Sequence, residues 1–168
     1  MRAMPFGVVF GLLLSASATT AEVIPPDGGE ARLFAGRPLW IKVDPVTVGA
    51  THFMVGTELL EAGKAIPVHR HTNMEEILFI HKGTVTVTQG ETTSVGGPGT
   101  VVFVPKNTWI GVENHSTEPS LILFVFPMVG MEGFFRRVAA RVGEPAVRLT
   151  PEEREAIFQQ FQIFPKRP

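Results

Sequence analysis

The chain has 168 residues, 44% of them hydrophobic and 18% charged, so it is long enough and apolar enough to fold around one core. Its formal net charge of −1 gives no electrostatic footprint for nucleic acid, and we expect no nucleic-acid partner. The sequence contains no cysteine, which excludes disulfides and thiolate ligands. A metal would therefore have to be held by nitrogen and oxygen atoms.

Residues 1–21 have the pattern of a secretory signal peptide. Arg2 gives a basic start, residues 6–14 form an apolar run too short to span a bilayer, and residues 16–18 read Ala-Ser-Ala, a cleavage-site pattern. We therefore expect a periplasmic or secreted protein with no membrane partner after signal cleavage. Residues 22–37, rich in Pro and Gly, are expected to form an N-terminal arm.

From residue 38 to residue 127, short β-branched segments alternate with Gly, Pro and Asn turns. The expected strands are 38–43, 47–60, 68–70, 76–80, 84–89, 92–95, 100–104, 110–113 and 121–126. Residues 89–91, Gln-Gly-Glu, are typical of a hairpin turn. This density of short strands predicts an all-β fold, an antiparallel β-barrel or jelly roll.

The hydrophobic period changes in the C-terminal extension, residues 128–168. Residues 131–142 place Phe134, Phe135 and Val138 at helical spacing. Residues 150–153, Thr-Pro-Glu-Glu, combine an N-cap, a proline at the first helical position and a capping-box glutamate. Two C-terminal helices are predicted, the second running to about residue 162, and we expect them to pack on the outside of the barrel.

The segment from Gly63 to Gly83 carries the candidate site. His69 and His71 are one residue apart, so on a β-strand both imidazoles face the same side. Glu76 follows a short polar break, and a returning antiparallel strand would bring its carboxylate to that side. Two neutral imidazoles and one carboxylate suit a divalent transition metal such as Fe, Mn, Ni, Cu or Zn. The neighbouring Glu75 is expected to point to solvent.

This segment, G-x5-HxH-x4-E-x6-G, resembles the first motif of the cupin superfamily. Residues 99–114 resemble the second motif, G-x5-P-x-G-x2-H-x3-N, with matches at Gly99, Pro105 and Asn114. Asn107 stands in place of the glycine, and Ile110 replaces the histidine that is usually the remaining metal ligand. The resemblance implies a small single-domain cupin barrel over residues 38–127, similar to quercetin-dioxygenase-like cupins, and by analogy a homodimer.

Three interpretations of the missing ligand remain open. The three first-motif residues suffice, as a facial triad with open positions for substrate and oxygen. Alternatively, His52 or His115 approaches from elsewhere and fills the gap. In the third interpretation the metal has been lost and the barrel binds an apolar ligand. His81 is an odd number of residues from Glu76 and is expected to point away from the cavity.

The expected cavity is small and largely apolar, with a polar cluster at one end. The residues expected to face inward are Leu78, Ile80, Val102, Val104 and Val112. Trp109 and Phe53 are candidates for the mouth of the cavity, although packing in the core is the commoner role of such aromatic side chains.

The leading hypothesis is an exported metal-dependent cupin, a dioxygenase-like oxidoreductase that acts on a small oxygenated or aromatic compound. His69, His71 and Glu76 would be the metal ligands, and Glu76 would also be the catalytic base. The alternative is a non-catalytic small-molecule-binding cupin whose degenerate metal site is marked by Ile110. A third hypothesis is metal-independent isomerase chemistry with a histidine as base, so the sequence leaves open whether the chain is an enzyme.

Overall fold

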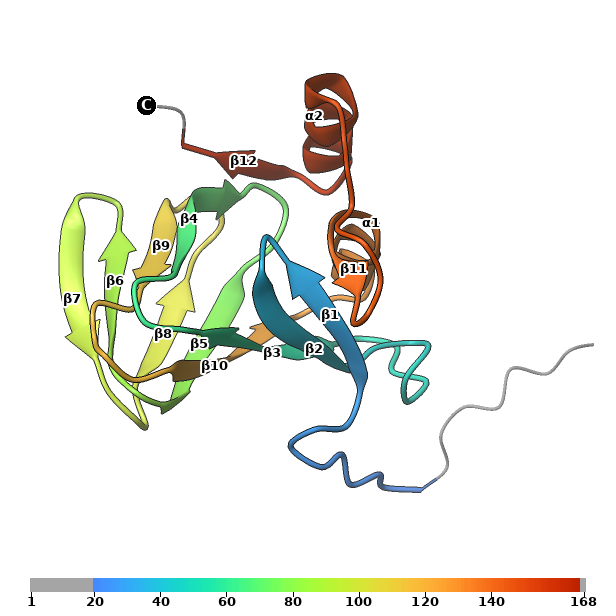
Figure 1. Ribbon diagram of the computed structural model, residues 1–168, viewed down its shortest axis with the longest axis horizontal. Helices are drawn as coiled ribbons and strands as arrows, with labels where there is room; N and C mark the ends of the chain where they lie inside the picture. Colours follow the sequence, from blue (N-terminus) through green and yellow to red (C-terminus); the bar gives the residue numbers. More distant parts are fainter. Residues whose placement is uncertain (1–19, 167–168) are drawn as a thin grey trace, which may run out of the picture.

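The fold is that of a computed structural model, which describes residues 20–166 (Figure 1). The expected signal peptide lies outside the described residues, except for its last two positions. The strands are β1 (Glu30–Phe34), β2 (Arg37–Val43), β3 (Met54–Leu60), β4 (Ala65–His71), β5 (Glu76–Lys82), β6 (Val85–Gln89), β7 (Thr92–Gly96), β8 (Val101–Val104), β9 (Ile110–Glu113), β10 (Ser120–Phe126), β11 (Ala140–Arg141) and β12 (Ile163–Pro165). The helices are α1 (Met131–Val138) and α2 (Pro151–Gln160).

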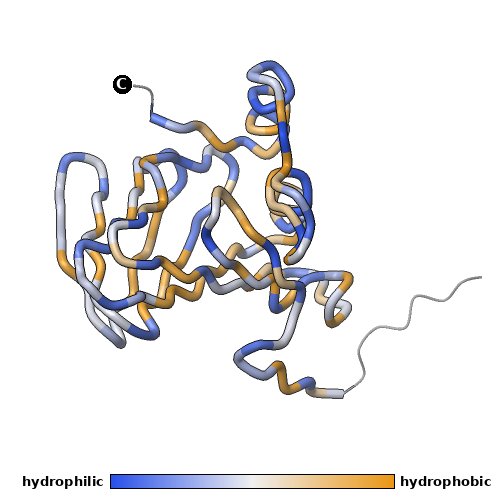
Figure 2. The backbone as a smooth tube through the Cα atoms, viewed as in Figure 1, coloured by the Kyte–Doolittle hydropathy of each residue, from blue (hydrophilic) through white to orange (hydrophobic). Residues whose placement is uncertain are grey.

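Two antiparallel sheets form the barrel. One sheet has the strand order β11-β1-β2-β3-β10-β5-β8, and the other has the order β12-β4-β9-β6-β7. Buried and partly exposed residues alternate strictly along β3 and β10, as expected for strands that turn one face to a core. Hydrophobic residues are concentrated along the strands of the barrel (Figure 2). The predicted all-β jelly roll with C-terminal helices is confirmed.

The second-motif turn keeps its shape without glycine. Asn107 has a φ of 63°, in the left-handed region where Asn is one of the few residues that substitutes well for Gly. Its backbone N–H donates a hydrogen bond of 2.7 Å to the carbonyl of His71. The turn between β8 and β9 therefore supports the end of the strand that carries both histidines of the first motif.

The C-terminal segment forms a wall beside the barrel (Figure 1). The predicted capping box is confirmed: Thr150 accepts from the N–H of Glu153, whose side chain accepts from the N–H of Thr150. Phe134 of α1 makes edge-to-face contacts with Phe34, Phe135 and Phe158. Burying each such ring contributes roughly 1.5–3 kcal/mol, so this aromatic cluster attaches the helices firmly to β1.

Three segments differ from the sequence-based expectation. Residues 47–53 are a turn rather than part of a strand, because the Asp44 carboxylate accepts from the backbone N–H groups of Val46 and Thr47. The expected first helix ends at Val138 instead of Val142, because residues 140–141 pair with β1. Within the expected arm, residues 30–34 form β1.

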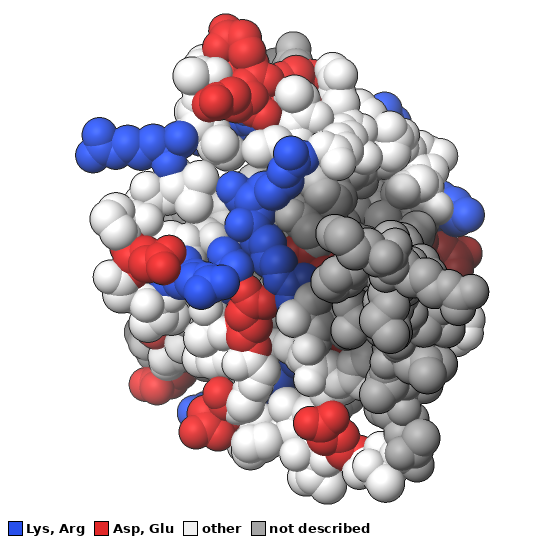
Figure 3. Space-filling model, turned by 90° about the vertical axis from the view of Figure 1, so that its right-hand side faces the viewer, with Lys and Arg blue, Asp and Glu red and all other residues white. Residues whose placement is uncertain are grey.

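Charged side chains tie α1 to the first hairpin. Arg136 lies 2.6 Å from Glu30 and 2.5 Å from the buried Asp44, and Arg32 donates to the carbonyl of Ala139. On the side of the molecule that carries these elements, basic side chains gather next to acidic ones (Figure 3). These pairs fix the position of α1 over the barrel. Within residues 20–166, no helix is both long and apolar enough to cross a bilayer.

Candidate metal centre

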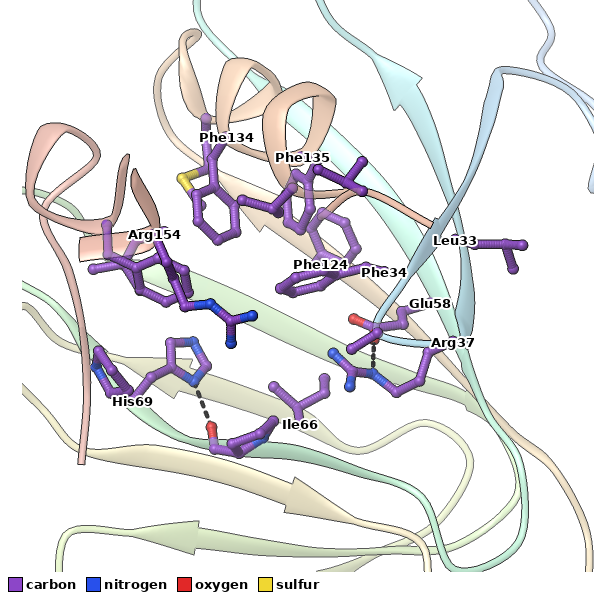
Figure 4. Close-up of a pocket in the computed structure, with 18 of the residues that line it drawn as sticks. Leu33, Phe34, Arg37, Glu58, Ile66, His69, Phe124, Phe134, Phe135 and Arg154 are labelled. Atoms are coloured by element: carbon purple, nitrogen blue, oxygen red, sulfur yellow. Dashed lines mark hydrogen bonds and ion pairs between the residues drawn. The ribbon is translucent and has the colours of Figure 1, made fainter. Parts of the chain in front are cut away.

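A cavity of about 760 Å³ opens between the two sheets and the C-terminal wall (Figure 4). Its strand side carries polar groups, and its other side is mostly aromatic and aliphatic. The tail contributes Phe134, Phe135, Val138, Leu149 and Phe158. The cavity is therefore larger than the small space expected from the barrel strands alone, because the tail extends it.

His69 and His71 both line this cavity from β4. Their ring centroids are 5.0 Å apart and their planes nearly perpendicular. The pairing of β4 with β9 is irregular between Ile66 and His69, around Pro67, which has no N–H to donate to the ladder. On the other side of β4, β12 pairs with the same residues, Ile163 opposite His71 and Pro165 opposite His69. The histidine strand is thus held from both sides.

The tautomer of His69 follows from its hydrogen bond. Its Nδ1 lies 2.8 Å from the carbonyl oxygen of Pro67, and a carbonyl can only accept, so Nδ1 carries the proton (Figure 4). The Nε2 lone pair is then free for a metal, which is how a backbone carbonyl commonly orients a metal-binding histidine.

Glu76, the first residue of β5, brings its carboxylate to the two histidines. Its Oε2 is 3.8 Å from Nε2 of His71. Only 6% of Glu76 is exposed, whereas Glu75 points to solvent as expected. The antiparallel return of the chain after the polar break therefore has the predicted effect, and it places all three side chains in one space.

The three residues fit a divalent metal. One potential ligand atom from each of His69, His71 and Glu76 lies within 4.8 Å of the others. Ligands bound at about 2.1 Å lie at most about 4.2 Å apart, so small side-chain rotations would close the site. Both ring nitrogens of His71 and Oε2 of Glu76 are buried with no hydrogen-bond partner. Buried polar atoms are rarely left unpaired, and a metal ion would satisfy one nitrogen and the oxygen.

Burial sets the charge of these groups. It lowers the pKa of His71 to about 3, with a further contribution from His69, and it also lowers the pKa of His69. Burial raises the pKa of Glu76 to about 8, and the nearby Glu58 carboxylate adds to this shift. At neutral pH without metal, both imidazoles are neutral and ready to bind, whereas Glu76 must release a proton first.

Ile110 occupies the expected place of the missing ligand. It lines the cavity and pairs with His69 across β9 and β4. The histidines considered as substitutes do not approach it: His52 and His115 are exposed and lie outside the cavity lining, and His115 is 3.0 Å from Glu113 at the surface. His81 is also exposed, as expected. The structure therefore brings together three candidate ligands and an isoleucine.

The lining of the barrel was predicted only in part. Leu78 and Val112 face the cavity, whereas Ile80 is buried in the core behind it. Neither Trp109 nor Phe53 lines the mouth. The ring of Trp109 instead packs against the guanidinium of Arg70 on the outer side of β4, and Phe53 is exposed. Val102 and Val104 also lie outside the lining.

Two buried charged residues of the cavity lie outside the predicted site. Arg37 and Glu58 are buried and joined by an ion pair. A signal was present, because Glu58 has the same parity on its strand as the buried Met54 and Leu60. Glu144, Arg154 and Glu155 also lie on the lining, Arg154 from α2 (Figure 4), and no local pattern indicates that these exposed residues face a cavity.

Comparison with known proteins identifies the class. Residues 56–126 match the Cupin_2 family, described as a cupin domain. The fold is similar to that of a sugar phosphate isomerase "from a cupin superfamily" of Silicibacter pomeroyi, with 18% identity, a TM-score of 0.57, and coverage of 64% of this chain and 76% of that one. It is also similar to KdgF from Halomonas sp., with 15% identity, a TM-score of 0.57, and coverage of 67% and 99%.

A third similar structure is a Cupin 2 conserved barrel domain protein from Salinispora arenicola, with 21% identity, a TM-score of 0.56, and coverage of 70% of this chain and 98% of that one. No curated protein matches the sequence. At these identities the structural likeness establishes the fold and leaves the reaction open. Residues 56–126 form a cupin domain, and the barrel that contains them has the cupin fold.

Proposed function

We propose that this protein is an exported cupin that holds one divalent transition metal through His69, His71 and Glu76. We further propose that it acts as a dioxygenase-like enzyme on a small oxygenated or aromatic compound. The metal is one of Fe, Mn, Ni, Cu or Zn, all of which accept imidazole and carboxylate ligands.

One observation carries this proposal. The unpartnered buried atoms of His71 and Glu76 lie together at the polar end of a cavity that is otherwise mostly apolar. Leaving such atoms unpaired costs roughly 1–3 kcal/mol each, and a bound metal would remove this cost for the oxygen and for one nitrogen. The cavity volume of about 760 Å³ is within the range of small-molecule sites, so a substrate has room beside the metal.

The chain's own residues would divide the work. When bound, the metal supplies Lewis acidity and a template that lowers the pKa of a substrate hydroxyl. The two histidines hold their positions through β4. Glu76 would serve as the third ligand, and its carboxylate would be the group in the site able to accept the hydroxyl proton.

A second candidate function is non-catalytic binding of a small molecule by a cupin with a degenerate metal site. Ile110 favours this alternative, because it presents an aliphatic side chain to the cavity where the second cupin motif has a ligand. Binding would then depend on the apolar wall alone. Metal content and oxygen consumption separate the two functions.

We also propose a homodimer and export to the periplasm or the extracellular space. The outer face of β5 and β8 leaves Ile77, Val101 and Phe103 exposed, and Ile77 pairs with Phe103 in register. An exposed apolar face of this kind supports association of two copies. Export is supported by the sequence pattern of residues 1–21. Sedimentation velocity and N-terminal sequencing of the exported protein test these two points.

The test of the activity is oxygen consumption by the metal-loaded protein. Metal-free protein is loaded separately with each of the five ions and assayed with catechols, flavonols and diketones. We expect oxygen uptake with at least one ion and its loss in His71→Ala, while His81→Ala, which changes an exposed histidine, retains it. Stoichiometric metal binding without oxygen uptake on any of these compounds would contradict the dioxygenase-like activity.

A further inference from the structure

The cavity holds a buried arginine that the metal site does not use. Arg37, at the start of β2, is only 6% exposed, and Glu58 on the adjacent β3 is only 4% exposed. Nε of Arg37 donates to the carboxylate of Glu58, and its guanidinium carbon lies 5.1 Å from the centre of the Phe34 ring. The arginine side chain is therefore fixed at two points.

The edge of this guanidinium that carries Nη1 and Nη2 makes no hydrogen bond to the described residues. Nε is bonded to Glu58, but the terminal nitrogens Nη1 and Nη2 of Arg37 have no hydrogen-bond partner among the described residues. The close-up view shows these nitrogens directed into the cavity (Figure 4). Two parallel N–H groups on one edge of an arginine match the two oxygens of a carboxylate. The structure thus presents a preformed site for a planar anion.

Arg37 and the candidate metal ligands face the same space. Both line the same cavity, and the charge of Arg37 contributes to the lowered pKa of His69. Apolar side chains, including Ile66 and Phe124, line the wall between them. Arg154 adds a second positive charge from α2 (Figure 4), although the acidic Glu144 and Glu155 also lie on the lining. Specific recognition would therefore come from Arg37 in the interior rather than from an overall positive field.

We propose that Arg37 recognises the carboxylate of a small, mainly apolar or aromatic acid that occupies the cavity, and that Glu58 positions Arg37 for this contact. A carboxylate fits better than a phosphate, because a dianion would need more donors than one arginine edge whose charge Glu58 offsets. This inference deepens the proposed function by naming the substrate class. It rests on the same cavity, but recognition through Arg37 does not require the metal.

The test compares an acid with its uncharged analogue of the same shape. Binding of 2-naphthoate and 2-naphthamide is measured by calorimetry, with zinc-loaded and with metal-free protein. We expect the wild-type protein to bind the acid at least about tenfold more tightly than the amide in both forms, as for a charge-assisted pair inside a protein.

The variants isolate the role of the arginine. Arg37→Gln combined with Glu58→Gln removes both charges and leaves no unpaired buried charge, and this protein should bind acid and amide about equally. Arg37→Lys keeps the charge without the planar edge and should lose most of the preference. Arg141→Gln, an exposed arginine outside the cavity lining, is the matched control and should keep the wild-type preference. Circular dichroism checks that each variant is folded.

Several results would overturn the inference. They are equal binding of acid and amide by the wild-type protein, no measurable binding of the acid, or a preference that survives in the double variant. A preference seen only with zinc and independent of Arg37 would mean that the metal binds the carboxylate, which overturns this inference and leaves the proposed metal site intact. Conversely, an Arg37-dependent preference in a protein that binds no metal would support the inference while the proposed function fails.

Discussion

The two walls of the cavity differ in both chemistry and origin. The strand wall, from β4 and β5, carries His69, His71 and Glu76 within a short stretch of chain. The tail wall, from α1 and α2, is formed mainly by aromatic rings such as Phe134 and Phe158. The difference suggests that the barrel determines what chemistry is possible, whereas the C-terminal extension determines the size and shape of the ligand. We therefore expect that the two walls can be altered separately by substitution.

The largest expected effect comes from breaking the tail wall with Phe134→Ala. This residue is 3% exposed and contacts four other phenylalanine rings, so the substitution should lower the free energy of unfolding by about 3–5 kcal/mol in urea titrations. Zinc affinity of the folded variant should not change. Phe53→Ala, at a position 55% exposed, is the control and should stay within about 0.5 kcal/mol of wild type. A parallel loss of zinc affinity would show that the walls are not separable.

Glu76 of the strand wall should make the stability of the metal-free protein depend on pH. Because the pKa of Glu76 in the fold, about 8, lies above its ordinary value of 4.5, its protonated carboxyl stabilises the metal-free protein fully below pH 4.5. This contribution is lost as the pH rises through about 8. Wild-type protein should therefore lose stability relative to Glu76→Gln between these two pH values, as measured by urea unfolding. The exposed Glu75→Gln should follow the wild-type curve.

The same titration predicts proton release. Zinc binding near pH 7 should displace about one proton from Glu76, and the release should vanish well above pH 8. Calorimetry in buffers of different ionisation enthalpy measures this number directly. A release that is unchanged in Glu76→Gln would rule out this carboxyl as the source.

A fourth metal ligand can be added to the strand wall at position 110. Ile110→His places an imidazole opposite His69 in the paired strands and should raise zinc affinity by about tenfold or more, as determined by competition with a chelator. Val112→His is the matched control, since it faces the same cavity but pairs with Ile66, farther along the strand. Equal effects of both substitutions, or no gain from Ile110→His, would indicate that the polar end of the cavity has been remodelled.

The smallest effect is expected at the start of α2. Thr150→Ala removes the capping box and should cost about 1 kcal/mol of stability in thermal or urea unfolding, whereas Thr150→Ser keeps the hydroxyl and should recover most of the loss. Zinc affinity should be unaffected. If alanine and serine have the same effect, the hydroxyl is not what stabilises the helix start.

The two walls also differ in how much of their structure could be predicted from the sequence. The strand wall was predictable because its information is local: i, i+2 spacing places His69 and His71 on one side, and a polar break returns Glu76 to them. The left-handed backbone conformation of Asn107 and the N-cap at Thr150 were likewise predictable from residue type and position. These features depend on backbone geometry within a few residues.

The rest depends on contacts between distant segments. Nothing local indicates that β12 would pair with the histidine strand or that Arg154 would face the cavity. The first helix ends early because residues 140–141 pair with β1 and Arg32 donates to the carbonyl of Ala139. These tertiary contacts override the helical pattern of the sequence. Arg37 and Glu58 were detectable by strand parity, but their pairing required the register of β2 with β3.

The most direct test of the metal centre is the metal content of the protein from residue 22 onward, purified without a histidine tag. We expect one equivalent of a divalent transition metal per chain, lost in the double variant His69→Ala/His71→Ala and retained in the surface double variant His81→Ala/His115→Ala. Elemental analysis after gel filtration measures it. A wild-type protein that takes up no metal from excess ions, or a His69→Ala/His71→Ala variant that keeps its metal, would contradict the proposed metal centre.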